Sequence, residues 1–197
     1  THSAKGEITI EYVNNSPDVL SEIWMHCWPN AYASRRSAFN RQKTRQRDGE
    51  FHFAPDSSLG GLSGLEFRAN GQAIQWAFDP KNPDIARLTL PNPLPPNTKV
   101  VISTPFTLDI PASFSRLGHV GQSYQMTQWY PKPAVYDNRG WHPIPYLDQG
   151  EFYSEFGNFD VSITLPANYV VGATGVLQNP AELDFLMQKE AETRTKM

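Results

Sequence analysis

The sequence has a single cysteine, Cys27, among its 197 residues, so it contains neither an internal disulfide nor a cysteine-based zinc cluster. It also lacks an excess of charge of one sign, because 17 Lys and Arg face 20 Asp and Glu, for a formal net charge of -3. Such a balanced chain has no strong basic field with which to bind nucleic acid. No run approaches the roughly 20 apolar residues that a membrane-spanning helix requires. We therefore expect no nucleic-acid partner and no membrane span.

Long helical periods are scarce as well, whereas turn-forming and strand-forming residues are plentiful. The sequence holds 17 Pro, 13 Gly and 12% aromatic residues, a profile typical of many short strands joined by tight turns. Residues 8–12 alternate apolar and polar side chains, which predicts a strand with one wet face. Residues 23–28 are apolar on both faces and end at Pro29, which predicts a central strand covered on both sides.

The Asn70-Gly71 pair is the clearest hairpin signal, with strands expected at residues 65–69 and 73–78 on either side of a primed turn. Further strands are expected at residues 86–90, 99–109, 158–165 and 169–177, with a proline-rich connection at residues 91–96. Strands at this spacing, without helical periods between them, predict an all-β fold. We expect one domain, built as a curved, saddle-like antiparallel sheet or a β-sandwich.

The last residues carry a helix signal. Asn179 suits a helix cap and Pro180 suits the first helical position, so we predict a short C-terminal helix. The predicted organisation is a β domain over residues 1–178 and a helical tail over residues 179–197. Because the chain opens at Thr1 without an initiator Met or a leader, we expect an excised segment whose tail leads toward a further domain.

Catalytic and metal-binding patterns are missing from the sequence. The five histidines form neither H-x-H nor H-E-x-x-H, and there is no G-x-S-x-G and no phosphate-cradling glycine loop. Cys27 lies in an apolar run and is interpreted as a small buried hydrophobe, and His26 beside it as a hydrogen-bonded core or partly buried histidine. We therefore predict no catalytic residue, no metal ligand and no cofactor in this chain.

A basic stretch at residues 34–47 leaves two interpretations open: a solvated loop or helix, or part of a face that docks an anionic partner. Its basic residues are Arg35, Arg36, Arg41, Lys43, Arg45 and Arg47.

An aromatic loop at residues 124–143 stands out from the rest of the chain. Trp129, Tyr130, Tyr136 and Trp141 fall within it, among prolines that stiffen the backbone. One interpretation is that these rings plug the end of the β domain as core, because aromatic side chains dominate core area. The other is a contact surface for a sugar ring or a partner domain.

Five blocks in this order resemble the N-terminal β domain of aminopeptidase N-like zinc metallopeptidases, especially their bacterial branch common in Bacteroidetes. They are Ile-Glu-Tyr-Val-Asn-Asn-Ser-Pro-Asp (10–18), Trp-Pro-Asn-Ala-Tyr (28–32), Gln-Trp-Tyr-Pro-Lys-Pro-Ala-Val-Tyr-Asp (128–137), Gly-Glu-Phe-Tyr-Ser-Glu-Phe-Gly-Asn-Phe-Asp-Val (150–161) and Val-Val-Gly-Ala-Thr-Gly (170–175). The resemblance covers nearly the whole chain. It implies a saddle-like β domain that precedes a thermolysin-like catalytic domain.

In that family the catalytic domain holds H-E-x-x-H, a downstream Glu and a Gly-x-Met-Glu-Asn segment. None of these motifs occurs in residues 1–197, so zinc is expected in the catalytic domain of the parent protein and not here. The resemblance implies that this domain is inactive alone, that it forms one wall of the peptide cleft, and that its partners are its own catalytic domain and the peptide substrate. It also points to a secreted, periplasmic or envelope-associated bacterial protein.

The resemblance further implies that a Gln or Glu on a cleft-facing loop helps to fix the free amino terminus of the peptide. Gln128 matches this position best, with Trp129 and Tyr130 beside it as substrate-binding residues. The stretch departs from the commoner family pattern at Trp129-Tyr130-Pro131 and at Asp137-Asn138, which places the register within a few residues. Gln128 equally suits a polar residue at a strand end with no ligand. Asp137 and Glu151 are expected to make structural hydrogen bonds in the same region.

A second function from a different class stays open. The chain would then be a carbohydrate- or protein-binding β-sandwich module that uses the aromatic loop at residues 124–143 as its platform. The coding sequence beyond Met197 discriminates between the two, because an H-E-x-x-H within the next ~150 residues, the scale of one domain, favours the peptidase.

Overall fold

The computed structural model describes residues 2–196, and these divide into two compact units, Thr1–Phe156 (unit 1) and Gly157–Met197 (unit 2). The chain is 34% strand and 18% helix, and its sheets are antiparallel, so the predicted all-β class is confirmed. The predicted domain over residues 1–178 therefore spans unit 1 and the first part of unit 2.

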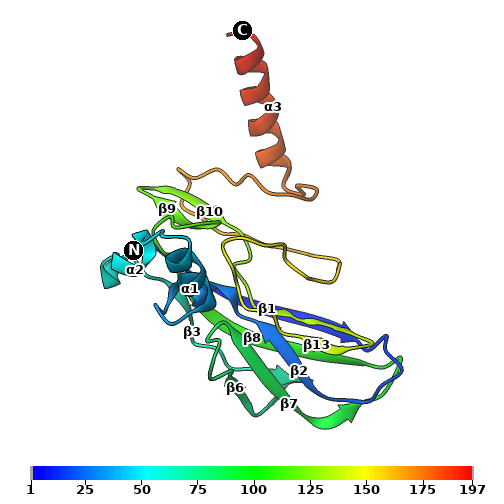
Figure 1. The fold of residues 1–197 in the computed structure, drawn as a ribbon. Coiled ribbons are helices and arrows are strands. Elements are labelled where there is room, and N and C mark those ends of the chain that lie inside the picture. Colours follow the sequence, from blue (N-terminus) through cyan, green and yellow to red (C-terminus); the bar gives the residue numbers. More distant parts are fainter. Residues whose placement is uncertain (1, 197) are drawn as a thin grey trace. The chain divides into compact units, whose positions relative to one another are not determined.

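The first sheet of unit 1 is built on two long paired strands, β1 (Ser3–Val13) and β8 (Lys99–Asp109) (Figure 1). They run antiparallel in unbroken register from Ser3 opposite Asp109 to Val13 opposite Lys99. Burial alternates along both strands, as their apolar and polar pattern predicts. Three short strands complete the sheet: β3 (Gly61–Ser63), β4 (Arg68–Ala69) and β5 (Gln72–Ala73).

The Asn70-Gly71 turn is present between β4 and β5, with φ of 48° at Asn70 and 81° at Gly71. Positive φ at both central residues defines the primed turn that the sequence predicts. The flanking strands are shorter than predicted, because β4 begins only at Arg68 and a separate strand, β6 (Trp76–Phe78), pairs in the second sheet.

The second sheet has the order β11 (Lys132–Pro133), β2 (Leu20–His26), β7 (Ile85–Leu94) and β6. Two boundary predictions are wrong here. The strand expected over residues 23–28 ends at His26, because Pro29 opens a 3-10 turn, η1 (Trp28–Tyr32). The proline-rich connection expected at residues 91–96 is instead the end of β7, which returns to β2 after an irregularity and pairs Leu94 with Leu20.

Two small hairpins and a helical segment lie outside these sheets (Figure 1). The hairpins are β9 (Leu117–Val120) with β10 (Ser123–Met126), and β12 (Val135–Asp137) with β13 (Gly140–His142). The helical segment contains α1 (Ala38–Arg45), α2 (Glu50–Phe53) and η2 (Asp56–Ser58).

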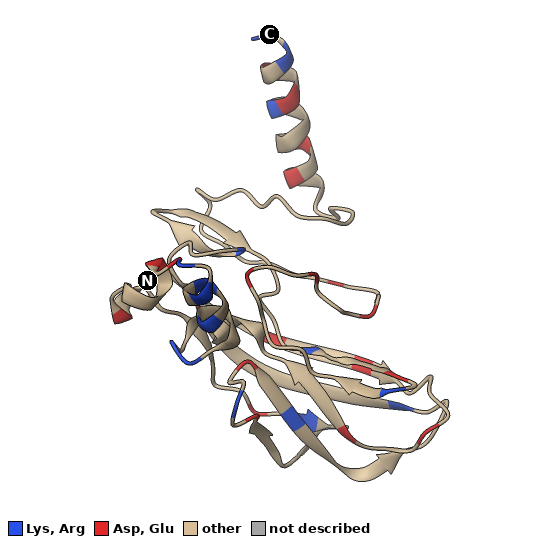
Figure 2. Ribbon diagram, viewed as in Figure 1, with Lys and Arg blue, Asp and Glu red and all other residues tan. Residues whose placement is uncertain are grey.

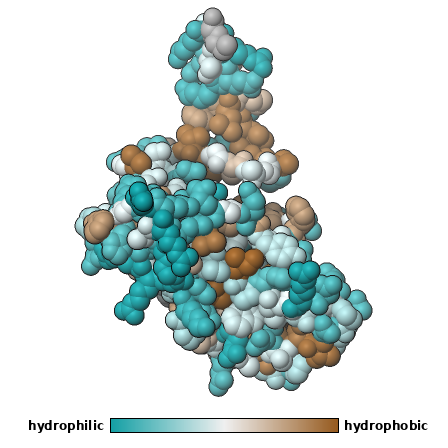
Figure 3. Space-filling model, viewed as in Figure 1, coloured by the Kyte–Doolittle hydropathy of each residue, from teal (hydrophilic) through white to brown (hydrophobic). Residues whose placement is uncertain are grey.

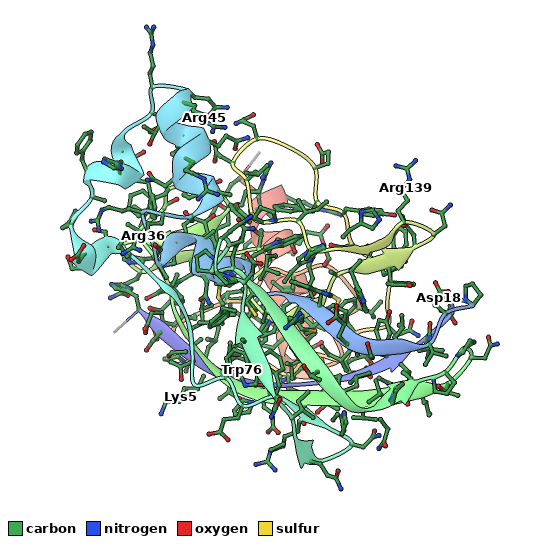
Figure 4. All side chains as sticks on the ribbon, turned by 60° about the horizontal axis from the view of Figure 1, so that its bottom comes forward. Lys5, Asp18, Arg36, Arg45, Trp76 and Arg139 are labelled. Atoms are coloured by element: carbon green, nitrogen blue, oxygen red, sulfur yellow. The ribbon has the colours of Figure 1, made fainter. Side chains whose placement is uncertain are left out.

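The basic stretch coincides with α1 and the turn before it, where the ribbon carries several blue segments in Figure 2. Figure 4 shows Arg36 and Arg45 in this helical segment, away from Asp18 and Arg139. Part of the charge is used internally, because Arg35 pairs with Asp56 at 2.7 Å and the buried Lys43 pairs with Asp48 at 2.6 Å. The stretch therefore includes structural ion pairs on a helix as well as solvated side chains.

The core of unit 1 is strongly aromatic. Tyr32, Phe39, Phe51 and Tyr146 pack ring to ring, and the hydroxyls of Tyr32 and Tyr146 share a hydrogen bond of 2.8 Å. Cys27 is fully buried, and burial raises the pKa of its thiol, so it is the inert buried hydrophobe that the sequence predicts.

The described part of unit 2 contains one helix, α3 (Pro180–Arg194), which confirms the predicted C-terminal helix. The Asn179 side chain accepts from the backbone N–H of Ala181 at 3.1 Å, and Pro180 begins the first turn. In Figure 3 apolar side chains gather on the N-terminal half of α3, whereas its C-terminal half is hydrophilic. None of the helices within residues 2–196 has the length and apolar character to cross a membrane.

The strands predicted at residues 158–165 and 169–177 are wrong, because the structure has no strand there. The first segment does alternate in strand fashion, with Phe159, Val161, Ile163 and Leu165 as its apolar members. A strand exists only when a neighbour supplies its backbone hydrogen bonds, and none of the described residues of unit 2 forms such a neighbour.

Candidate functional site

The predicted site residue Gln128 lies in unit 1, on the bend between β10 and β11. Its backbone has φ of 54°, the left-handed region that residues other than glycine seldom adopt. Pro131 and Pro133 follow it and limit the backbone freedom of β11. The backbone at Gln128 thus carries about 1 kcal/mol or more of strain.

The side-chain oxygen of Gln128 accepts a hydrogen bond from the ammonium group of Lys132. Lys132 Nζ also donates to Ser154 Oγ at 2.8 Å and lies 4.2 Å from the centroid of the Trp28 ring. These four residues, Gln128, Lys132, Ser154 and Trp28, are called the Lys132 cluster below. An ammonium is the group that the family resemblance implies for the Gln128 oxygen, but here the ammonium belongs to the chain itself.

Lys132 is half-buried, and every contact given above is to a neutral group. No ion pair within residues 2–196 joins Lys132 to a carboxylate, whereas Lys43, Lys99 and Lys189 each have one. Burial without a compensating anion disfavours the charged form and lowers the pKa of Lys132 to about 8.

His26 lies beneath the cluster, because it is the residue of β2 that pairs with Lys132 of β11. The imidazole is fully buried and stacks on Trp28 with ring centroids 4.3 Å apart. Burial, and to a lesser extent the nearby charge of Lys132, lower the pKa of His26 to about 3. The backbone of His142 lies close enough to offset this shift in part, although it forms no hydrogen bond of ordinary geometry with the ring. The predicted buried position of His26 is confirmed, but the predicted hydrogen bonding is wrong, because neither ring nitrogen has a hydrogen-bond partner within residues 2–196. The ring is neutral at physiological pH.

Trp129 and Tyr130, the other predicted binding residues, are both half-buried against the core. Trp129 packs near Phe106 with centroids 6.0 Å apart and meets Tyr130 edge to face at 5.4 Å. Tyr136 and Trp141 are likewise partly buried against the core. The aromatic loop thus contributes core area and keeps part of each of these side chains at the surface.

A small hollow lies beside the cluster, walled by Trp28, Ile144, Pro145 and Phe152. The Trp28 indole N–H donates to the Ile144 carbonyl oxygen at 2.9 Å, and its ring lies 4.7 Å from Phe152. Trp28 is therefore fixed at its edge and on its faces, and it presents a rigid apolar surface to Lys132.

The predicted structural hydrogen bonds of Asp137 are present. Asp137 accepts from the backbone N–H of Arg139 at 2.8 Å and from Tyr153 Oη at 3.2 Å, and it pairs with His142 Nε2 at 2.8 Å. The contact with His142 is the main reason why the pKa of Asp137 is lowered. Glu151 is exposed at the rim of the small hollow.

Sequence reasoning placed Gln128 but missed Lys132, Ser154 and Trp28 around it. The available signal was Lys132 itself, a cation within an aromatic and proline-rich run. Gln125 and Gln122, the two glutamines that precede Gln128 within a few residues, are exposed, and Gln125 lies on β10. Within residues 2–196 there is no group of three or more His, Cys, Asp or Glu side chains that could hold a metal ion.

Comparison with known proteins adds no relative: no family model, no curated protein and no solved structure matches this chain. Its function therefore has to be argued from the site.

Proposed function

We propose that this chain is the non-catalytic N-terminal β domain of a zinc aminopeptidase-like protein, in which the Lys132 cluster forms part of one wall of the peptide cleft. The observation that carries the proposal is the position of Gln128. Its strained backbone aims an amide oxygen at an ammonium group, the same chemical group as the free amino terminus of a peptide. Backbone strain of this kind persists only where the surrounding structure imposes it, which supports a role for the side chain.

The amide oxygen of Gln128 has room for a second donor. A carbonyl oxygen offers two lone pairs, and Lys132 uses one of them. Lys132 also keeps its bond to Ser154, so it can turn away from Gln128 without losing every acceptor. A peptide amino terminus would then bind Gln128 and hold the scissile bond over the metal of the catalytic domain, which is how remote binding contributes to rate.

Like-charge repulsion sets the main cost of this binding. Two ammonium groups ~5 Å apart repel by roughly 3 kcal/mol at an effective dielectric constant near 20. The lowered pKa of Lys132 reduces this cost, since the lysine gives up its proton near pH 8. The proposal therefore predicts that an alkylamine ligand whose own pKa is near 10 binds more tightly at pH 9 than at pH 7.

The test is made on the longer protein. Its coding sequence past Met197 should encode H-E-x-x-H, and the protein should release the amino-terminal residue of peptides. Gln128→Ala should then lower kcat/KM by about 10- to 150-fold, the range for one charge-assisted hydrogen bond. A stop codon soon after Met197 would overturn the proposal and favour the binding module. Loss of thermal stability in step with activity would make Gln128 a structural residue.

The binding module stays the second candidate, because Trp129 and Tyr130 keep part of their surface exposed. Equal binding of free and N-acetylated peptides, abolished by Trp129→Ala and unaffected by Gln128→Ala, would favour it.

A further inference from the structure

Among the lysines of this chain, Lys132 has an unusual surrounding. Its ammonium group contacts an amide oxygen, a hydroxyl and an indole ring, none of which carries a formal charge. Lys43, Lys99 and Lys189 contact the carboxylates of Asp48, Glu11 and Glu192 at 2.6–2.9 Å.

These contacts decide how readily each lysine becomes a nucleophile. Only the neutral amine has a lone pair with which to attack a carbonyl carbon, and a carboxylate neighbour keeps the amine protonated. A hydroxyl and an amide oxygen stabilise an ammonium less than a carboxylate does. The charged form of Lys132 is further disfavoured because His26, the residue that faces it from β2, supplies no negative charge.

The freedom of the amine is also restricted. Lys132 lies on the short strand β11 between Pro131 and Pro133, and its Nζ rests over the Trp28 ring. The side chain is half-buried and retains surface exposure, so a small acyl donor in solution can reach it. A restricted and partly desolvated amine reacts faster than a freely rotating one because less order must be created at the reaction step.

We propose that Lys132 Nζ is a selective acylation site, which takes a short acyl group from an activated acyl donor such as a thioester. The nitrogen lone pair attacks the carbonyl carbon, the carbon–nitrogen bond forms, and the carbon–sulfur bond breaks with release of the thiolate. The surplus proton on nitrogen passes to water. No oxidant or metal is needed, and the product is a neutral amide.

The lowered pKa of Lys132 raises the fraction of the amine that is neutral and can react. At pH 7.4 an amine with a pKa of about 8 is roughly 20% neutral, whereas an ordinary lysine with a pKa of 10.4 is roughly 0.1% neutral. Lower basicity makes each neutral amine a weaker nucleophile, so the net advantage is smaller than this ratio. We expect Lys132 to react at least about 10-fold faster than a solvated lysine at this pH.

The experiment is competitive labelling of the intact chain. A limiting amount of light N-acetoxysuccinimide reacts at pH 7.4, the protein is unfolded, and an excess of heavy reagent modifies the remaining amines. Mass spectrometry then gives the rate for each lysine, with exposed Lys5 as the internal reference. We expect Lys132 to carry the light label before Lys5, and the labelling rate of Lys132 to level off above pH 8. A rate at or below that of Lys5 would overturn the proposal.

Gln128→Glu is the decisive variant, because it replaces the amide oxygen with a carboxylate of the same shape. The new ion pair should slow the labelling of Lys132 by about 10-fold and leave Lys5 unchanged. Gln128→Ala should leave Lys132 at least as reactive as in the parent. If Gln128→Glu and Gln128→Ala label Lys132 equally fast, the neutral surroundings do not control its reactivity, and the proposal fails. Neither outcome depends on whether the chain belongs to a peptidase.

Discussion

The ammonium group of Lys132 lies 4.2 Å from the ring centroid of Trp28, and the neutral ring of His26 stacks on the same indole with ring centroids 4.3 Å apart. A cation and a buried base thus share one indole. Burial is the main reason why the pKa of His26 is lowered to about 3, and the nearby charge of Lys132 adds to it; burial is also what lowers the pKa of Lys132 to about 8.

Because of Lys132, the free energy of unfolding should vary with pH in the alkaline range. Its pKa is about 8 in the folded state and 10.5 in its ordinary state, so the unfolded chain binds more protons between these values. The free energy of unfolding should rise from pH 8 to pH 10.5 by about 1–2 kcal/mol, a figure reduced for the partial exposure of the side chain. Urea unfolding of the parent and of Lys132→Met at both pH values isolates this contribution. A constant difference between the two proteins would contradict it.

The titrations of Asp84 and His26 should change the free energy of unfolding in opposite directions as the pH changes, so the two effects mask each other. Asp84 is fully buried, and burial raises its pKa from 3.8 to about 6, so its contribution to stability is complete below pH 3.8 and is lost as the pH rises through 6. His26 is neutral when folded, so its contribution is complete above pH 6.5 and is lost as the pH falls toward 3. Each slope is at most roughly 1.4 kcal/mol per pH unit.

Single variants should separate the two slopes between pH 4 and pH 6. Asp84→Asn should lose stability as the pH falls, because only the His26 contribution remains, and His26→Gln should gain stability over the same range. The measurement is urea unfolding at half-unit pH steps. Curves that stay parallel to that of the parent would show that neither group has a shifted pKa.

The turn at Asn70-Gly71 gives a stability prediction that involves no side-chain contact. Gly71 has φ of 81°, and a Cβ there would meet nothing within 4 Å, so the only penalty of a side chain is backbone strain. Gly71→Val should lower the free energy of unfolding by about 1–2 kcal/mol, whereas Gly71→Asn should lower it by less than about 1 kcal/mol, because Asn tolerates this conformation. Equal melting temperatures of the two variants would contradict the assignment of strain.

Zinc should not bind this chain with useful affinity. Within residues 2–196 no three metal-binding side chains come together, and a zinc site needs at least that number. Calorimetry at neutral pH should give no stoichiometric binding of zinc chloride, and an aminoacyl reporter should not be hydrolysed. Tight binding at one zinc per chain would refute this expectation.

Local patterns could be read from the sequence, and pairings between distant segments could not. β8 covers the predicted residues 99–109, because alternation is visible in the strand itself, and α3 begins where Asn179 and Pro180 place it. The strand predicted at residues 158–165 has the same alternation, but no neighbouring strand lies within the described residues of its unit. Alternation alone was therefore insufficient to predict a strand there.

The candidate site shows the same difference between local patterns and contacts of distant segments. Gln128 was found through a resemblance to other sequences, but its partner was not, because the contact depends on three separate placements. These are the left-handed backbone at Gln128, the register that sets Lys132 opposite His26, and the return of Ser154 from 22 positions later in the chain. Spacing alone encodes none of these placements.

The most direct test of the central claim is the affinity of this chain for a tripeptide amide with a free amino terminus, compared with its N-acetylated form, by NMR titration at pH 7.5. The account predicts that the parent prefers the free amine, that Gln128→Ala removes the preference, and that Gln125→Ala, the matched exposed glutamine on β10, retains it. A preference that survives in Gln128→Ala but disappears in Gln125→Ala would contradict the claim and place the amine-binding residue at Gln125.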